Sequence, residues 1–293
     1  MSSYTEIFID AFGNYANYVW HQITFQASPW YENYFWWLVL VSVGVWGLEL
    51  MFPWRKNQGV FRKDFWLDAF FMFFNFYIFN LIIFIAFSKV VGEFLTSTAG
   101  GSISNWALID ISSLPNWLQL LIFFVVLDFA QWCVHNLLHR IPFLWRFHKV
   151  HHSVTEMGFA AHLRYHWMET VCYNPIKYIA VMLIGGFTPE QAYIVYFSSI
   201  AIGHLNHANI GWDYGPLKYI LNNPKMHIWH HAKELPEDHK YGANFGISLS
   251  VWDYLFRTNY VPKSGRDIEL GFEDIERYPN SFWRLITSGF RKK

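Results

Sequence analysis

The sequence predicts an all-α fold, an integral membrane helical bundle with a cap of shorter helices. Three observations lead to this prediction. The 293 residues are 53% hydrophobic and only 15% charged, whereas soluble domains carry about 25% charged residues. Several apolar stretches are long enough to cross a bilayer. Polar, histidine-rich segments follow these stretches in the second half of the chain.

The apolar stretches define the predicted helices of the membrane region. Three of them, 34–53, 65–88 and 117–134, have the length and composition of spanning helices. Two shorter stretches, 176–187 and 190–205, are separated by two glycines and a proline. Each is marginal for a full crossing, so together they predict a hairpin that is either shallow, re-entrant or built of two tilted helices.

Basic residues in the short loops predict the orientation. The loop after the first span holds Arg55, Lys56, Arg62 and Lys63, whereas the loop after the second span holds only Lys89. Because cytoplasmic loops carry the excess of lysine and arginine, the first loop is predicted to be cytoplasmic. The third span then ends on the cytoplasmic side, and every histidine-rich segment follows on that side.

The bulk composition argues against several classes of protein. The net charge is zero and no long basic run occurs, so nucleic acid is not expected as a partner. The two cysteines, Cys133 and Cys172, form no CxxC pair, which argues against a disulfide framework or a thiolate metal site. The first residues lack a basic start followed by an apolar core, so we expect no cleavable signal peptide.

Three histidine motifs carry the predicted chemistry. HNLLH places two histidines four residues apart on one helix face, and HKVHH at 148–152 and HIWHH at 227–231 each place three at i, i+3 and i+4. Neutral imidazole suits Fe, Zn, Cu and Ni, and one zinc site needs about four ligands. Eight clustered histidines exceed the need of one site, so the sequence predicts a cytoplasmic-side cap that holds two metal ions. The predicted ligands are His135, His139, His148, His151, His152, His227, His230 and His231.

This motif set resembles that of the fatty acid hydroxylase/sterol desaturase superfamily, across about residues 120–258. The resemblance implies a non-haem centre of two iron ions, which zinc can replace in purified protein. It implies that O2 is used to hydroxylate or desaturate an aliphatic position of a lipid of sterol, fatty acyl, alkylglycerol or carotenoid type. It also implies a separate electron donor of cytochrome b5, ferredoxin or reductase type, because the sequence shows no haem or flavin motif.

The resemblance extends the list of candidate ligands beyond the three motifs. His166 in RYHWME and His207 in LNHAN match further family positions and are predicted ligands. His162 matches an extra histidine of some sterol desaturases. His204 lies three residues before His207 and is predicted to share its face. We predict that His162 and His204 are either additional ligands or hydrogen-bond partners of ligands.

Two carboxylates and the chain's division complete the sequence predictions. Asp128 lies seven residues before His135 within an apolar span, and Glu169 lies three after His166. A carboxylate often holds the free N–H of a ligand histidine; lining of a watery pocket is the alternative for Asp128. We predict a membrane region at 1–116 and a catalytic domain at 117–258. The tail, 259–293, is either an interfacial helix or a packed cap.

Three other readings of the histidines remain open. A metal transporter or sensor would place its ligands in mid-membrane, on broken helices, whereas these motifs follow the ends of the spans. A bis-histidine haem carrier would need paired histidines on facing spans. A structural, non-catalytic member of the superfamily keeps the metal site without the reaction, and the motifs alone do not distinguish it from the enzyme.

Overall fold

The computed structural model describes residues 3–99 and 107–290, and this part of the chain is almost entirely helical. Its one sheet is a pair of two-residue parallel strands, β1 (Ile109–Asp110) and β2 (Ile184–Gly185). The predicted all-α class is therefore confirmed.

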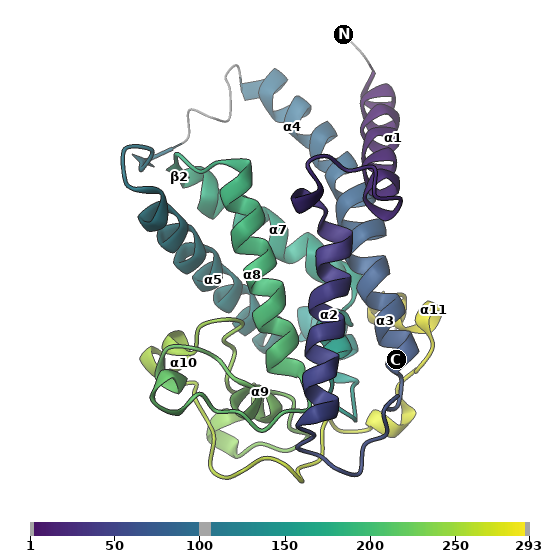
Figure 1. Cartoon of the computed structure of the whole chain (residues 1–293), viewed down its shortest axis with the longest axis vertical. Coiled ribbons are helices and arrows are strands. Elements are labelled where there is room, and N and C mark those ends of the chain that lie inside the picture. Colours follow the sequence, from purple (N-terminus) through teal and green to yellow (C-terminus); the bar gives the residue numbers. More distant parts are fainter. Residues whose placement is uncertain (1–2, 100–106, 291–293) are drawn as a thin grey trace.

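The long helices run side by side and form a bundle, as Figure 1 shows. Between residues 65 and 99 the chain stays helical, with α-helical ends and an 11-residue π-helical stretch between them. The long helical elements are α1 (Tyr4–Ile23), α2 (Tyr34–Met51), α3 (Phe65–Phe73), the π-helix η2 (Phe74–Phe84), α4 (Ile85–Ala99), α5 (Asn116–Arg140), α7 (Trp167–Leu183) and α8 (Pro189–His207).

Three helices are long and apolar enough to cross a membrane: Tyr34–Met51, Phe65–Phe94 and Asn116–Arg140. Only 17%, 24% and 44% of their apolar windows are buried inside the protein, so most residues of these windows are at least partly exposed at its surface. Outward apolar side chains on long helices are what lipid requires. The structure thus has a helix long and apolar enough for a span at each of the three predicted places, with ends that differ by up to about six residues, and it indicates a membrane protein.

The two shorter apolar stretches fold as a helical hairpin. α7 has 17 residues and α8 has 19, which gives lengths of about 25 Å and 28 Å. Thr188 begins α8 with a capping box to Gln191, and Pro189 occupies the first helical turn. The hairpin therefore runs the length of the bundle instead of forming a shallow loop, and its tip carries β2 (Figure 1).

Shorter elements gather at the end of the bundle opposite β2 and form the cap (Figure 1). The loop between α2 and α3 lies there too, because the Arg55 guanidinium donates to the carbonyls of Gly265 and Ile268. The α-helices of the cap are α6 (Pro142–His152), α9 (Pro224–His230), α10 (Val251–Leu255) and α11 (Phe282–Leu285). The 3-10 turns are η1 (Trp30–Glu32), between α1 and α2, and η4 (Phe159–Leu163), η5 (Gly215–Tyr219), η6 (Glu237–His239), η7 (Ile275–Arg277) and η8 (Ser288–Phe290).

A buried ion-pair network joins the start of α3 to the turn after η4. Asp68 is fully buried and pairs with both Arg62 and Arg164. Arg164, which is 1% exposed, also reaches Asp64 at 3.2 Å and the Ser153 hydroxyl at 2.9 Å. Removing one member of such a pair leaves a buried charge without a partner, which costs about 3–5 kcal/mol. The network fixes the backbone around residue 164, beside the histidines.

The C-terminal tail packs onto the helices. Leu285 is fully buried against Phe71 and Val150, and the Trp167 indole donates to the Ile286 carbonyl at 3.0 Å. The Phe290 ring lies 5.6 Å from that of Trp167. The tail therefore packs against the helices, and its position at the membrane interface remains a prediction. The division of the chain into three domains remains a prediction.

Candidate metal centre

Nine histidines of the described residues meet in two adjoining clusters beneath the helices. Within each cluster, one nitrogen of every ring lies within 4.8 Å of the others. The first cluster contains His135, His139, His148, His152 and His230. The second cluster contains His151, His207, His227 and His231.

Each three-histidine motif divides between the two clusters. On α6, His148 and His152 face the first cluster and His151 the second; around α9, His230 faces the first. Neighbouring positions on a helix point about 100° apart, so adjacent histidines reach different centres. The ring centroids of His151 and His152 lie 5.6 Å apart, so the two clusters are directly adjacent.

Hydrogen bonds fix the Nδ1 side of five of the rings. In the first cluster, Nδ1 of His135 and Nδ1 of His230 each lie 2.8 Å from a backbone carbonyl, of Phe245 and Ala243. In the second cluster, His151 and His207 bond the carbonyls of Arg164 and Gly203 at 3.1 and 2.8 Å. The fifth ring, His148, bonds the Glu169 carboxylate at 3.0 Å. A carbonyl only accepts, so in the four carbonyl-bonded rings Nδ1 carries the proton and Nε2 presents a lone pair; Glu169 as a carboxylate imposes the same on His148.

These lone pairs face one another, an arrangement that a bound cation would stabilise. The Nε2 atoms of His135 and His148 are 3.2 Å apart in the first cluster, and those of His151 and His207 are 3.3 Å apart in the second. Two unprotonated nitrogens repel and form no hydrogen bond. Around a metal with bonds of about 2.1 Å, neighbouring ligand nitrogens lie roughly 3.0–3.4 Å apart. The observed separations match that range.

Unpartnered atoms strengthen the fit to a metal. The Nε2 atoms of His139, His152 and His230 are buried without a hydrogen-bond partner in the first cluster. Burial lowers the pKa of His151 to about 3 and holds the pKa of His152 well below its usual value. The rings are therefore neutral near pH 7 and free to donate electron pairs. An all-nitrogen set suits Fe or Zn and not the oxygen-seeking Mg²⁺ or Ca²⁺.

Two buried aspartates hold the loop that supplies the backbone carbonyls. Asp253 accepts from the backbone N–H groups of Phe245 and Gly246 at 2.9 and 2.8 Å. Asp128 accepts from the N–H groups of Ser248 and Leu249. The predicted contact of Asp128 with a ligand histidine is therefore wrong: its two oxygens are used by the loop and by an indole N–H. The aspartate orients the histidines only through the backbone.

The other predicted additions to the site have different outcomes. Glu169 contacts a cluster histidine, His148, as expected of a supporting carboxylate. His166 lies in neither cluster, because it caps the start of α7 with Nδ1, which accepts from the Met168 N–H at 3.1 Å. Its ring packs on Phe147 at 4.9 Å between centroids. The structure thus removes His166 from the predicted ligand set.

His162 and His204 form a separate pair beside the second cluster. Their Nδ1 atoms are 2.8 Å apart, and the other nitrogen of His204 lies 3.2 Å from the Ser42 hydroxyl. The His162 ring centroid is 5.0 Å from that of His207. A Cβ at residue 203 would collide with the His162 ring, so Gly203 lets this ring approach α8. The pair supports the second cluster without belonging to it.

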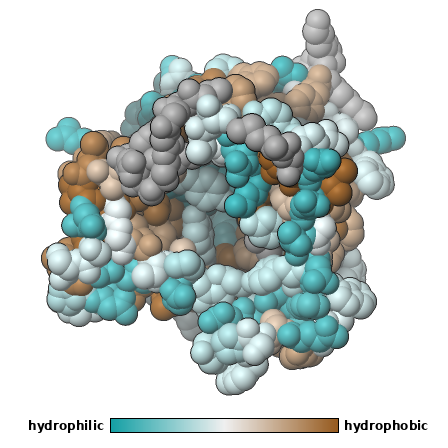
Figure 2. All heavy atoms as spheres, turned by 90° about the horizontal axis from the view of Figure 1, so that it is seen from above, coloured by the Kyte–Doolittle hydropathy of each residue, from teal (hydrophilic) through white to brown (hydrophobic). Residues whose placement is uncertain are grey.

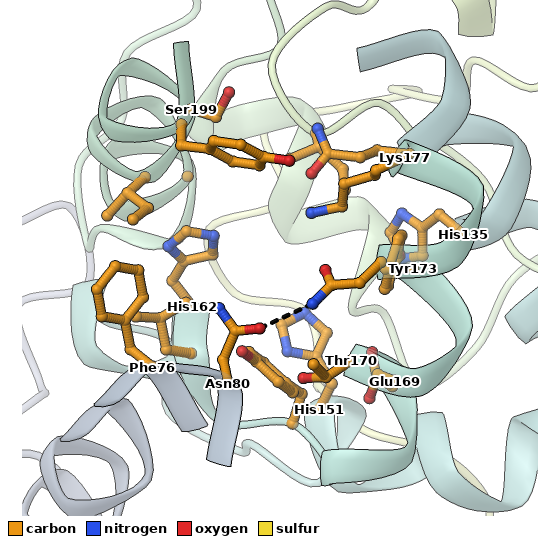
Figure 3. Close-up of a pocket in the computed structure, with 18 of the residues that line it drawn as sticks. Phe76, Asn80, His135, His151, His162, Glu169, Thr170, Tyr173, Lys177 and Ser199 are labelled. Carbon is orange, nitrogen blue, oxygen red and sulfur yellow. Dashed lines mark hydrogen bonds between the residues drawn. The ribbon is translucent and has the colours of Figure 1, made fainter. Parts of the chain in front are cut away.

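A cavity of about 360 Å³ leads from the histidines into the bundle. It is lined by members of both clusters, including His135 and His207, and reaches Tyr34 at the start of α2. Figure 3 shows labelled side chains around it, among them His151, Glu169 and Lys177. Figure 2 looks onto the end of the bundle away from the cap, and that face is hollowed at its centre.

Sequence reasoning overlooked two kinds of residue at this site. The carbonyls of Phe245 and Ala243 hold two rings of the first cluster, but a backbone atom leaves no signal in a sequence. Lys177 did leave one, since a charge within an apolar stretch is rare and commonly functional. It lines the cavity from the middle of α7.

Comparison with known proteins agrees with this geometry. Residues 120–258 match the model of the family described as fatty acid hydroxylase. An ornithine lipid hydroxylase of Rhizobium tropici is 32% identical over 157 residues, 54% of this chain and 46% of that protein. An alkylglycerol monooxygenase of Xenopus tropicalis is 26% identical over 164 residues, 55% of this chain and 34% of that protein. A very-long-chain aldehyde decarbonylase of Oryza sativa subsp. japonica is 26% identical over 148 residues, 48% and 46% of the two chains.

The matched segment includes every member of the two clusters. The alignments span less than half the length of these curated relatives. No solved structure matches the chain. Taken together, the family match, the three relatives and the histidine motifs show that this chain, through residues 120–258, belongs to the fatty acid hydroxylase superfamily.

Proposed function

We propose that this protein is a multi-pass membrane enzyme that oxidises an aliphatic C–H bond of a lipid with O2, using two iron ions held by the two histidine clusters. The observation that carries the proposal is the cavity: its walls include histidines of both clusters, and it runs between helices whose outer faces suit lipid. The family's description and the names of the relatives support lipid oxidation.

Bound iron would supply the oxidising power that no side chain has. In the net reaction, one atom of O2 enters the C–H bond as a hydroxyl group. The other atom leaves as water, and its formation consumes two electrons from a separate donor protein and two protons from solvent. The relatives named hydroxylase and monooxygenase favour hydroxylation over desaturation.

The protein's own contribution is to orient ligands and to exclude water. The Nδ1 bonds of His135 and His230 hold these rings against a loop fixed by Asp253. Such support around the ligands commonly changes metal affinity by about 10- to 100-fold. The centre has no thiolate ligand, because neither Cys133 nor Cys172 belongs to a cluster or lines the cavity. This suits oxidising chemistry, since thiolates are readily oxidised.

We further propose that the cap faces the cytoplasm. The loop that holds the four basic residues Arg55, Lys56, Arg62 and Lys63 lies at the cap end, where Arg55 bonds the tail. Positive loops stay on the cytoplasmic side. The electron donor, of cytochrome b5, ferredoxin or reductase type, would then approach the cap while the lipid enters from the bundle.

The arrangement is less suited to a metal transporter. Transporters hold ions near mid-membrane at broken helices, whereas both clusters lie at one end of the bundle, on α5, α6, α8 and α9. The rings are also locked by hydrogen bonds to backbone carbonyls, which favours permanent binding over release.

The experiment that tests this proposal is labelling with ¹⁸O2. Iron-loaded protein in lipid nanodiscs would be given a chemical reductant, an electron donor and a panel of fatty acyl, alkylglycerol and sterol lipids. We expect one labelled oxygen in one lipid class and none with His227→Ala, whose ring belongs to the second cluster. Absence of any oxidised lipid from a protein that carries two irons per chain would overturn the proposal.

A further inference from the structure

Lys177 is the charged group in the cavity that the proposed reaction leaves without a role. Among the described residues that line the cavity, only Glu169 and Lys177 belong to the Asp, Glu, Lys and Arg types. Glu169 is engaged by His148 at 3.0 Å. Lys177 makes no hydrogen bond or ion pair with any residue in the described ranges 3–99 and 107–290. A positive charge thus faces the cavity without a negative partner.

Aromatic rings and amides surround this lysine. Its Nζ lies 5.6 Å from the ring centroid of Tyr173 and 5.4 Å from that of Tyr196. Asn174, three residues earlier on α7, bonds Asn80 of η2 at 2.7 Å, and both line the same cavity. Figure 3 shows the labelled Lys177, Tyr173 and Asn80 around the cavity, with the Asn80 bond as a dashed line. The wall at this level is polar, although the helices around it are apolar.

The aromatic contacts alone do not account for a lysine here. A cation over an aromatic ring gains little compared with the loss of hydration inside an apolar bundle. Charges in such places pair with an opposite charge or mark the path of a substrate. Because the protein supplies no carboxylate to Lys177 among its described residues, the missing partner is best sought in the ligand.

We propose that Lys177 binds the acidic group of the lipid substrate, a carboxylate or a phosphate, inside the cavity. Lys177 follows Glu169 by eight residues on α7, a rise of about 12 Å along a helix. Glu169 contacts the first cluster, so Lys177 lies about two helical turns further along α7 than this contact with the histidines. Lys177 therefore selects acidic lipids and places a carbon several bonds from the acidic group at the reacting centre.

The binding of an acidic group by Lys177 does not depend on the proposed oxidation. The placement of a carbon at the reacting centre rests on the proposed function. The test of the binding is consequently an equilibrium binding experiment on protein in detergent micelles, with no turnover. The probe is the fluorescent fatty acid cis-parinaric acid, compared with its uncharged methyl ester. Lys177→Met removes the charge at similar length, and Lys177→Arg restores it. Lys89→Met is the matched control, since Lys89 lines a neighbouring cavity that shares Ile85 and Tyr178 with the first.

The expected result is a difference between the two probes that depends on residue 177. Wild type and Lys177→Arg should bind the acid about 10- to 100-fold more tightly than the ester, as a charge-assisted bond would give. Lys177→Met should lose that preference and keep its affinity for the ester, which also shows that the variant is folded. Lys89→Met should behave as wild type.

Other outcomes overturn the inference. Equal affinity of wild type for acid and ester would show that no acidic group is recognised in the cavity. Loss of the preference in Lys89→Met but not in Lys177→Met would place recognition in the other cavity. Competition with lysophosphatidic acid against a free fatty acid then distinguishes a phosphate from a carboxylate. A failure of oxygen incorporation with intact acid selectivity would count against the proposed function and leave this binding site standing.

Discussion

Replacing Glu169 by leucine should weaken one metal site and spare the other. The Glu169 carboxylate lies 3.0 Å from Nδ1 of His148, and the two residues are only 4% and 2% exposed. It makes no such contact with the second cluster. Losing a carboxylate that supports a ligand histidine commonly lowers metal affinity about 10- to 100-fold, or about 1.4–2.8 kcal/mol.

An independent estimate gives the same size. Glu169→Leu leaves the Nδ1–H of His148 buried without an acceptor, and an unsatisfied buried donor costs about 1–3 kcal/mol. The assay is an anaerobic Fe²⁺ titration against a chelator, which resolves a tight and a weak site. Glu169→Gln is the matched control: its amide oxygen still accepts a hydrogen bond, so we expect a smaller loss. Equal weakening of both sites, or of neither, would show that Glu169 does not support the first cluster selectively.

Three further predictions concern the supports of the centre. Gly203→Ala should lower the free energy of unfolding by about 1–3 kcal/mol, the usual effect of overpacking, because its Cβ would collide with the His162 ring; an unchanged melting temperature beside an Ala201→Gly control would contradict the close packing. Asp128→Asn should lower the melting temperature while folded protein keeps its metal, since Asp128 holds the 248–249 backbone and no histidine; loss of metal at full stability would contradict this. Burial lowers the pKa of His166 to about 4, below the unfolded value of about 6.5, so its contribution to stability is present above pH 6.5 and is lost as the pH falls through 4. In His166→Asn, the new side chain should still cap the start of α7, and the metal content should not change. The fall in melting temperature between pH 6.5 and 4 should become smaller. Loss of one metal ion would instead show that His166 is a ligand.

The sequence alone predicted the three long apolar helices because their signal is local. A run such as 34–53 is apolar in every context, and its length is set by the bilayer. The structure ends this helix at Met51, a difference of two residues. The hairpin at 176–205 was ambiguous because each half is short and carries polar residues. Some of those polar residues line the cavity, as Lys177 and Ser199 do.

The sequence predicted which histidines make up the candidate site better than it predicted how they are arranged. The eight motif histidines all lie in the two clusters, and His207 joins them. The division of each three-histidine motif between the two clusters was not predicted, because it depends on where α6 and α9 lie relative to α5 and α8. Asp128 was misjudged for a similar reason: helical spacing put it on the face of His135, yet the loop at 248–249 reaches its oxygens first.

The most direct test of the central claim is the iron content of anaerobically reconstituted protein and of single variants in each cluster. His230 and His227 lie on the same short helix and face different clusters, so their alanine variants are a matched pair. With one iron in each cluster, we expect about two irons per chain for wild type, about one for each single variant and none for the double variant. Equal loss of both irons in each single variant would contradict two separate histidine sites. One iron per chain in wild type would contradict the two-metal centre itself.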